Sequence, residues 1–179
     1  MKGAFRRTFA RQAPTKRPWL RDIILGGQDG LVNVLGVVLG VAAANGSRQI
    51  LLAASLAAAF AESFSMAAVA YTSGQAEEDF NKQEFGSKWQ IISSPPNFFV
   101  VGLAALVASF IPILPFLFWT RETASLLAFV ASGVTLFLVG AYEARSYRGN
   151  WWQHGLRMLI IGLGAAIGGF LIGKIFQVN

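Results

Sequence analysis

The chain has 179 residues, of which 54% are hydrophobic and only 13% are charged, and its formal net charge is +6. Soluble domains contain about 25% charged residues, so this composition argues against a soluble protein and predicts a membrane protein. Because the chain has no cysteine, disulfide bonds, thiolate zinc sites and thiol nucleophiles are excluded.

Residues 1–21 form a basic arm that contains no acidic residue. No short apolar core separates its cations from the first apolar stretch, so a cleavable signal peptide is not expected. A disordered cytoplasmic arm is favoured, with a transit peptide or a segment bound to anionic lipid as alternatives. Nucleic-acid binding is not expected, because it would leave the apolar remainder of the chain unexplained.

Five apolar stretches follow the arm, at residues 23–44, 50–73, 98–119, 125–142 and 156–176. Each is long enough to cross about 30 Å of hydrocarbon at about 1.5 Å per residue. A spanning segment must satisfy its own backbone hydrogen bonds, so each stretch is predicted to be a helix. The predicted fold is therefore an all-α integral membrane protein with five transmembrane helices over residues 22–179. Residues 74–97 are expected to form a short acidic cytoplasmic loop.

The placement of Lys and Arg predicts the orientation in the membrane. The connection after the first span carries only Arg48, and the connection after the third span carries only Arg121. The arm and the fourth connection are basic, the latter through Arg145, Arg148 and Arg157. The positive-inside rule therefore places the N-terminus in the cytoplasm and the C-terminus outside it, in a cell membrane or a vacuole-type organelle membrane.

Acidic side chains inside the apolar stretches mark the candidate functional site. Asp29 and Asn33 are four residues apart in the first stretch, so a helix places both oxygen ligands on one face. Glu62 and Met66 share a face of the second stretch in the same way. Carboxylate, amide and thioether ligands together suit Fe²⁺, Mn²⁺, Zn²⁺ or Co²⁺ better than Ca²⁺ or Mg²⁺. The sequence therefore predicts a transition-metal site at these four residues.

Each of these residues also has a purely structural interpretation. Asp29 can cap a helix or pair with Arg21 or Arg157, and Met66 can fill the core. Glu62 can pack in its protonated form, although an acidic residue near mid-membrane costs about 2.5 to 3.5 kcal/mol. In the loop, Glu77, Glu78 and Glu84 are weak candidates for cytoplasmic metal contacts, and a solvated acidic helix end is favoured there.

Small residues and prolines predict how the helices pack. Gly36 and Gly40, like Gly164 and Gly168, are four apart, a spacing that suits close helix contact and is compatible with a dimer. Pro112 and Pro115 are expected to kink the third helix. His154 is the only histidine, and a proton or metal role for it is not favoured because it has no evident partner.

Three segments of the chain have the form of known helix signatures. They read RDIILGGQDGLV at 21–32, SMAA at 65–68 and GLRMLIIG at 155–162. In this order they resemble the first helix, the second helix and the start of the last helix of the vacuolar iron transporter family. The resemblance covers nearly the whole chain from Arg21 to Phe176.

The resemblance implies a homodimer of five-helix protomers, with an ion path between the subunits. Members of the family export cytosolic Fe²⁺, and often Mn²⁺, typically in exchange for protons, and Asp29 and Met66 match positions associated with the metal. The family often has a Glu where this chain has Ala70, and many members insert a metal-collecting domain between the second and third helices, where this chain has only residues 74–97. Glu62 is a candidate for the missing carboxylate.

The resulting hypothesis is a transporter that moves Fe²⁺ or Mn²⁺, with Co²⁺ and Zn²⁺ as further substrates, and holds no permanent cofactor. Carboxylates bind metal only after losing their protons, so Asp29 and Glu62 are also the candidates for proton coupling. A non-transporting scaffold or sensor with an altered site is the alternative. An enzyme is not expected, because no paired histidine or activated nucleophile accompanies the intramembrane carboxylates.

Overall fold

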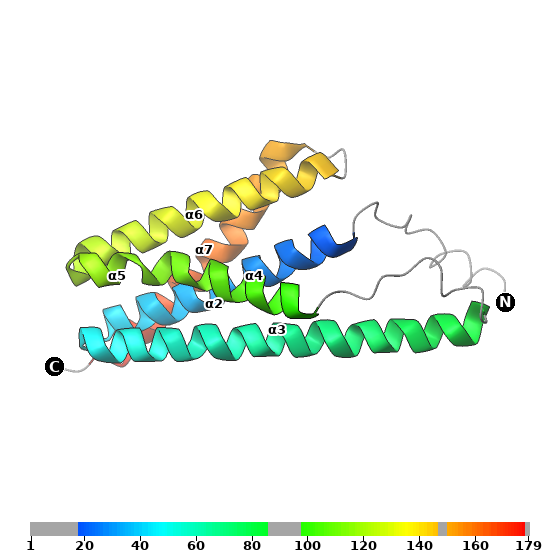
Figure 1. The fold of residues 1–179 in the computed structure, drawn as a ribbon. Helices are drawn as coiled ribbons and strands as arrows, with labels where there is room; N and C mark the ends of the chain where they lie inside the picture. Colours follow the sequence, from blue (N-terminus) through cyan, green and yellow to red (C-terminus); the bar gives the residue numbers. More distant parts are fainter. Residues whose placement is uncertain (1–17, 86–97, 147–149, 178–179) are drawn as a thin grey trace.

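The computed structural model describes residues 18–85, 98–146 and 150–177, over which it contains helices joined by short turns and no strand. Its helices are α2 (Pro18–Ala43), α3 (Arg48–Phe85), α4 (Phe98–Ile113), α5 (Pro115–Phe118), α6 (Arg121–Ser146) and α7 (Trp151–Ile175). The long helices lie side by side and run back and forth along a common direction, with α7 crossing more obliquely (Figure 1). The all-α prediction is confirmed for the described residues.

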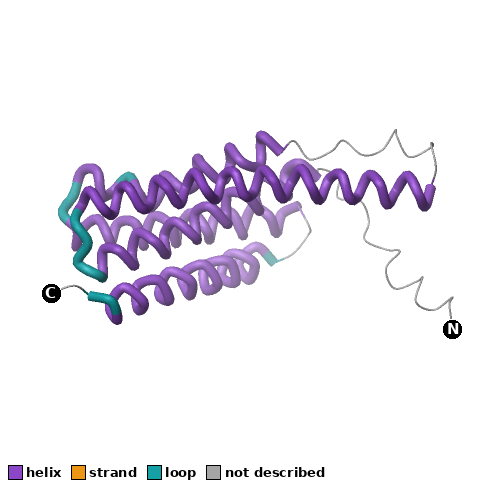
Figure 2. The backbone as a smooth tube through the Cα atoms, turned by 90° about the horizontal axis from the view of Figure 1, so that it is seen from below, coloured by secondary structure: helices purple, strands orange, loops and turns teal. Residues whose placement is uncertain are grey.

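In the part of the chain that is described, α2, α3, α6 and α7 are long and apolar enough to cross a membrane. The turn between α2 and α3, the turn between α5 and α6 and the end of α7 gather at one end of the bundle (Figures 1 and 2). The start of α2, the end of α6 and the start of α7 lie at the opposite end. This arrangement supports an integral membrane protein.

Helix α3 is longer than the second apolar stretch. It continues through Gly74 to Phe85, so the first half of the expected loop at 74–97 is helical, and it projects beyond the rest of the bundle (Figure 1). The segment after Gly74 contains three Glu and two Gln, which favour helix, and a single glycine costs only about 1 kcal/mol. Residues 86–97, and residues 1–17 of the expected arm, lie outside the described residues.

The third apolar stretch is divided into two helices. Helix α4 has 16 residues and contains Pro112, and α5 begins at Pro115 after a break at Leu114. Because proline has no backbone N–H, Pro115 cannot donate the next helical hydrogen bond. The backbone of Leu114 still donates to Phe110, at 2.9 Å. The predicted irregularity is thus present, and it falls at Pro115.

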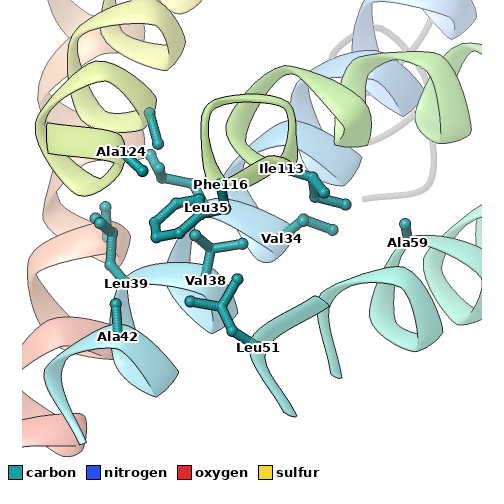
Figure 3. Packing of buried hydrophobic residues seen from close by; sticks show 12 residues of the cluster. Val34, Leu35, Val38, Leu39, Ala42, Leu51, Ala59, Ile113, Phe116 and Ala124 are labelled. Carbon is teal, nitrogen blue, oxygen red and sulfur yellow. The ribbon is translucent and has the colours of Figure 1, made fainter. Parts of the chain in front are cut away.

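The main core joins α2 to the helices around it. Its fully buried side chains include Leu35 and Val38 of α2, Leu51 of α3 and Ile113 of α4. Figure 3 shows these side chains converging, together with Phe116 of α5. In a bilayer the alternative surroundings of these side chains are lipid, so close van der Waals packing, rather than removal from water, holds them together. The core therefore fixes α2 at the centre of the bundle.

Helices α2 and α7 meet backbone to backbone at glycines. A Cβ atom on Gly169 would lie 2.3 Å from the carbonyl oxygen of Gly36, and one on Gly173 would lie 2.0 Å from that of Gly40. A Cβ atom on Gly164 or Gly168 would have no neighbour within 4 Å. Gly36 and Gly40 thus make the predicted close contact, but their partners within the protomer are Gly169 and Gly173. Gly164 and Gly168 lie on an open side of α7.

The turn after α2 is a left-handed helix cap of the Schellman type. Asn45 has φ of 60°, the backbone N–H of Gly46 donates to the carbonyl of Val41 at 3.1 Å, and that of Asn45 donates to Ala42 at 3.3 Å. The Asn45 side chain accepts a hydrogen bond from Arg121 Nη1 at 3.0 Å. Arg48 donates to the carbonyl of Leu117 at the same end. Both arginines therefore link the turn between α2 and α3 to the region where α5 is followed by α6.

We expect Asn45→Val to destabilise the protein by about 1 to 2 kcal/mol, because a β-branched residue is strained in the left-handed region. Asn45→Gly removes that strain but also loses the acceptor for Arg121, so its cost is expected to be smaller. Thermal unfolding in detergent measures both. Equal stability of the valine and glycine variants would contradict this account of the turn.

Candidate functional site

The orientation of α2 is set by glycines that contact α4. A Cβ atom on Gly26 would lie 2.8 Å from the carbonyl oxygen of Val101, and one on Gly30 would lie 2.4 Å from that of Ala105. Only glycine allows this approach. With Gly26 and Gly30 facing α4, Asp29 and Asn33 lie on a different face of α2 and are exposed.

Glu62 joins these two residues from α3. Its carboxyl group is close enough to interact with the side chains of both Asp29 and Asn33. The half-buried Glu62 therefore faces α2 at the level of Asp29, in the interior of two candidate membrane spans. Two carboxylates this close repel each other when both are ionised, and a bound cation removes that repulsion. The arrangement offers two carboxylates and an amide oxygen to one ion.

Met66 lies one turn further along α3, but it is directed elsewhere. It is 8% exposed and packs with Ala70, Val101 and Ala105 between α3 and α4. Glu62 and Met66 therefore lie one turn apart on the same face of α3, as predicted. Glu62 contacts α2, whereas Met66 contacts α4. Ala70 belongs to the same apolar contact, where a carboxylate would be desolvated.

The rotation of α3 against α4 depends on Ser63 and Gly102. Ser63 Oγ donates to the carbonyl of Gly102 at 2.8 Å. A Cβ atom on Gly102 would lie 2.9 Å from the carbonyl oxygen of Ser63, so the two backbones are nearly in contact. This contact turns Glu62, the neighbour of Ser63, toward α2. Helical spacing does not predict this role of Ser63, for which the only local signal is a serine next to an intramembrane carboxylate.

One protomer offers few side chains that could bind a metal ion. Over the described residues, no group of three or more His, Cys, Asp and Glu side chains is placed to hold a metal ion. Asp29 and Asn33 are open on the side away from α4. From Asn33, a groove of about 510 Å³ follows α2 and α7 past Gly36 and Gly40. The polar site therefore opens onto a surface of small residues.

The other predicted contacts do not join this site. Glu78 is exposed on the part of α3 that projects from the bundle, and the side chains of Glu77 and Glu84 lie outside those that the structure describes. His154 is half-buried in the first turn of α7. Metal binding at any of these residues stays a prediction.

The profile of the VIT family matches residues 20–98 and 96–174. The chain is 32% identical over 158 residues to "Vacuolar iron transporter homolog 1" of Oryza sativa, with 80% of this chain and 68% of the relative covered. It is 31% identical over 91 residues to "Vacuolar iron transporter 1" of Arabidopsis thaliana, covering 51% of this chain and 36% of that protein. With the family profile matching nearly the whole described helical region, the chain belongs to the VIT family.

Proposed function

We propose that this protein transports a divalent transition metal, Fe²⁺ or Mn²⁺, out of the cytosol. The observation that carries the proposal is the meeting of Glu62 with Asp29 and Asn33 inside two candidate membrane spans. Ionisable groups at such depth are costly and are retained at ion pathways. The names of the rice and Arabidopsis relatives, which designate iron transporters, support the choice of substrate.

The proposed topology has five crossings. Helix α4 is short for a span, but residues 98–118 of α4 and α5 together reach about 30 Å at about 1.5 Å per residue. Because the start of α2 and the end of α7 lie at opposite ends of the bundle, an odd number of crossings fits the structure (Figure 1). The N-terminus is then cytoplasmic and the C-terminus extracytoplasmic, as the basic residues favour.

The proposed transporter is a homodimer in which a second copy completes the ion path. Two carboxylates and one amide leave a divalent transition metal short of ligands. Asp29 and Asn33 are exposed on one side of the protomer, and the surfaces around Gly164 and Gly168 are open. A second protomer facing Asp29 would double the number of carboxylates around the ion and remove the site from lipid.

Proton exchange follows from the ligands that we propose. Metal binding to Asp29 and Glu62 requires both carboxylates to be ionised, so binding on one side of the membrane releases protons and release on the other side takes them up. We expect an inwardly directed metal gradient and an acidic vesicle interior to act together in driving metal uptake. A transport rate that does not depend on the pH gradient would contradict exchange and favour a channel-like path.

Uptake into sealed proteoliposomes tests the proposal. Fe²⁺ kept reduced, Mn²⁺, Co²⁺, Zn²⁺ and Ca²⁺ are compared, with a pH-sensitive dye inside the vesicles. We expect uptake of the transition metals with proton release from the interior, and much slower uptake of Ca²⁺. Transport of Ca²⁺ at the rate of Fe²⁺ would be incompatible with the selectivity that we propose.

The variant Met66→Leu tests whether Met66 is a metal ligand or only a packing residue. Leucine has nearly the volume of methionine, so the contact with Val101 and Ala105 is expected to cost less than about 1.5 kcal/mol. If the thioether reaches the ion during transport, selectivity for Fe²⁺ over Ca²⁺ should fall about tenfold while folding is kept. Unchanged selectivity at unchanged stability would make Met66 a core residue only.

The second candidate is a non-transporting member of the family. The lack, over the described residues, of three clustered acidic or histidine ligands favours it. Such a protein would be folded and dimeric but would show no metal uptake under any pH gradient. Replacement of Asp29 or Glu62 would then leave metal handling unchanged.

A further inference from the structure

A second cavity lies where α6 approaches the start of α7. Its volume is about 640 Å³, and its lining includes Leu138, Ala141, Tyr142 and Arg145 of α6, Trp151 of α7 and Ile24 of α2. Its lining includes Arg145 in the last turn of α6 and Trp151 at the start of α7, so it lies toward that end of the bundle. It shares no lining residue with the groove beside Asn33.

Four of the six α6 residues that line the cavity lie on one face of the helix. Leu138, Ala141, Tyr142 and Arg145 are spaced at i, i+3, i+4 and i+7, and Phe137 and Val139 flank this face. Along this face the side chains change from apolar, through the amphipathic Tyr142, to the cationic Arg145. Leu138 and Tyr142 are exposed on the surface of a candidate membrane span. This order matches a lipid molecule, which has an acyl chain at one end and a charged headgroup at the other.

Arg145 is available to a ligand. It is exposed and makes no hydrogen bond or ion pair with another residue in the described parts of the chain. Glu143, the nearest carboxylate in sequence, is about 200° around the helix from it, because each residue turns the chain by about 100°. The start of α7 at Trp151 also lies at the cavity, and helix N-termini favour anions. Two features therefore attract negative charge to the same end of the cavity.

Phe137 and Trp151 line the cavity beside the start of α7, and Trp152 packs against both rings. The rings of Phe137, Trp151 and Trp152 contact one another edge to face, with centroids 5.3 to 6.3 Å apart. Tryptophan and tyrosine are favoured at the boundary between hydrocarbon and headgroups, because one part of each ring is apolar and the other is polar. This end of the cavity is therefore expected at headgroup depth.

We propose that this cavity binds an anionic phospholipid, with the phosphate on the Arg145 guanidinium and an acyl chain along Leu138 and Ile24. Arginine donates paired hydrogen bonds to phosphate oxygens, and the bond is strengthened by charge. The apolar part of the cavity favours a lipid over a free phosphate, which would leave the surface of Leu138 uncovered. The site does not depend on which ion the protein transports.

Native mass spectrometry of the purified full-length protein tests the site. The protein is mixed with equal amounts of phosphatidylglycerol and phosphatidylcholine, and the lipid adducts are counted. We expect wild type to retain phosphatidylglycerol preferentially and Arg145→Gln to bind it about tenfold more weakly. Leu138→Ser, which keeps the guanidinium, should weaken both lipids by removing the apolar contact.

Arg157→Gln is the matched control, because Arg157 is an exposed arginine on α7 that does not line the cavity. It should bind lipid as wild type does. Equal losses in the Arg145 and Arg157 variants, or no loss in either, would overturn the proposal. Displacement of the lipid by millimolar inorganic phosphate alone would also overturn it and assign the site to a soluble anion.

Discussion

Asp29→Asn is expected to weaken binding of Mn²⁺ to the purified protein at least about 100-fold, and Glu62→Gln by a similar factor. Each change keeps the size of the side chain and removes one negative charge from the ligands around the ion. Residues that merely orient metal ligands already contribute 10- to 100-fold, so the loss of a ligand should exceed that range. Equilibrium binding followed by the electron paramagnetic resonance of free Mn²⁺ measures the effect.

The double variant tests whether the two carboxylates share one ion. Because Asp29 and Glu62 interact directly, we expect the combined loss to be smaller than the product of the single losses. Glu122→Gln is the control, since Glu122 is an exposed carboxylate in the first turn of α6. Independent effects of Asp29 and Glu62, or an equal effect of Glu122, would contradict a shared site.

Gly173→Ala is expected to destabilise the protein strongly, although alanine is the better helix former by about 1 kcal/mol. The added methyl group would lie 2.0 Å from the carbonyl oxygen of Gly40, so α2 and α7 must separate. Overpacking of this kind typically costs about 1 to 3 kcal/mol. Thermal unfolding in detergent should show a lower Tm, and metal uptake should fall as well because α2 carries Asp29.

Gly168→Ala, five residues earlier on α7, provides the matched comparison. A methyl group there meets no atom within 4 Å in the protomer. We expect the protomer of the Gly168→Ala variant to have the same Tm as the wild-type protomer. If Gly168→Ala destabilises the protomer as much as Gly173→Ala does, the assignment of the contact between α2 and α7 is wrong.

Much of the fold could be predicted from the sequence because a bilayer imposes strong requirements on composition and length. The apolar stretches at 23–44 and 156–176 correspond closely to α2 and α7. The end of α3 could not be predicted from hydropathy. Its last turns are polar helix formers outside the apolar stretch, and Gly74 does not break the helix there.

The candidate site shows where periodicity is sufficient and where it is not. Spacing by four residues correctly placed Asp29 with Asn33 on an exposed face of α2. The approach of Glu62 to this face depends on how α2 and α3 are rotated. The contact of Gly30 with α4 sets the first rotation, and the contact of Gly102 of α4 with Ser63 sets the second. Met66 follows Glu62 by one turn yet faces α4. Helical periodicity within one segment contains no information about such contacts between segments.

Transport through Asp29 is tested by the initial rate of Fe²⁺ uptake into proteoliposomes, measured side by side for wild type, Asp29→Asn and Glu122→Gln. We expect saturable uptake by wild type and the Glu122 variant, and a rate close to that of protein-free vesicles for the Asp29 variant. Wild-type uptake no faster than in protein-free vesicles, or undiminished uptake by Asp29→Asn, would show that the protein does not transport Fe²⁺ through this site.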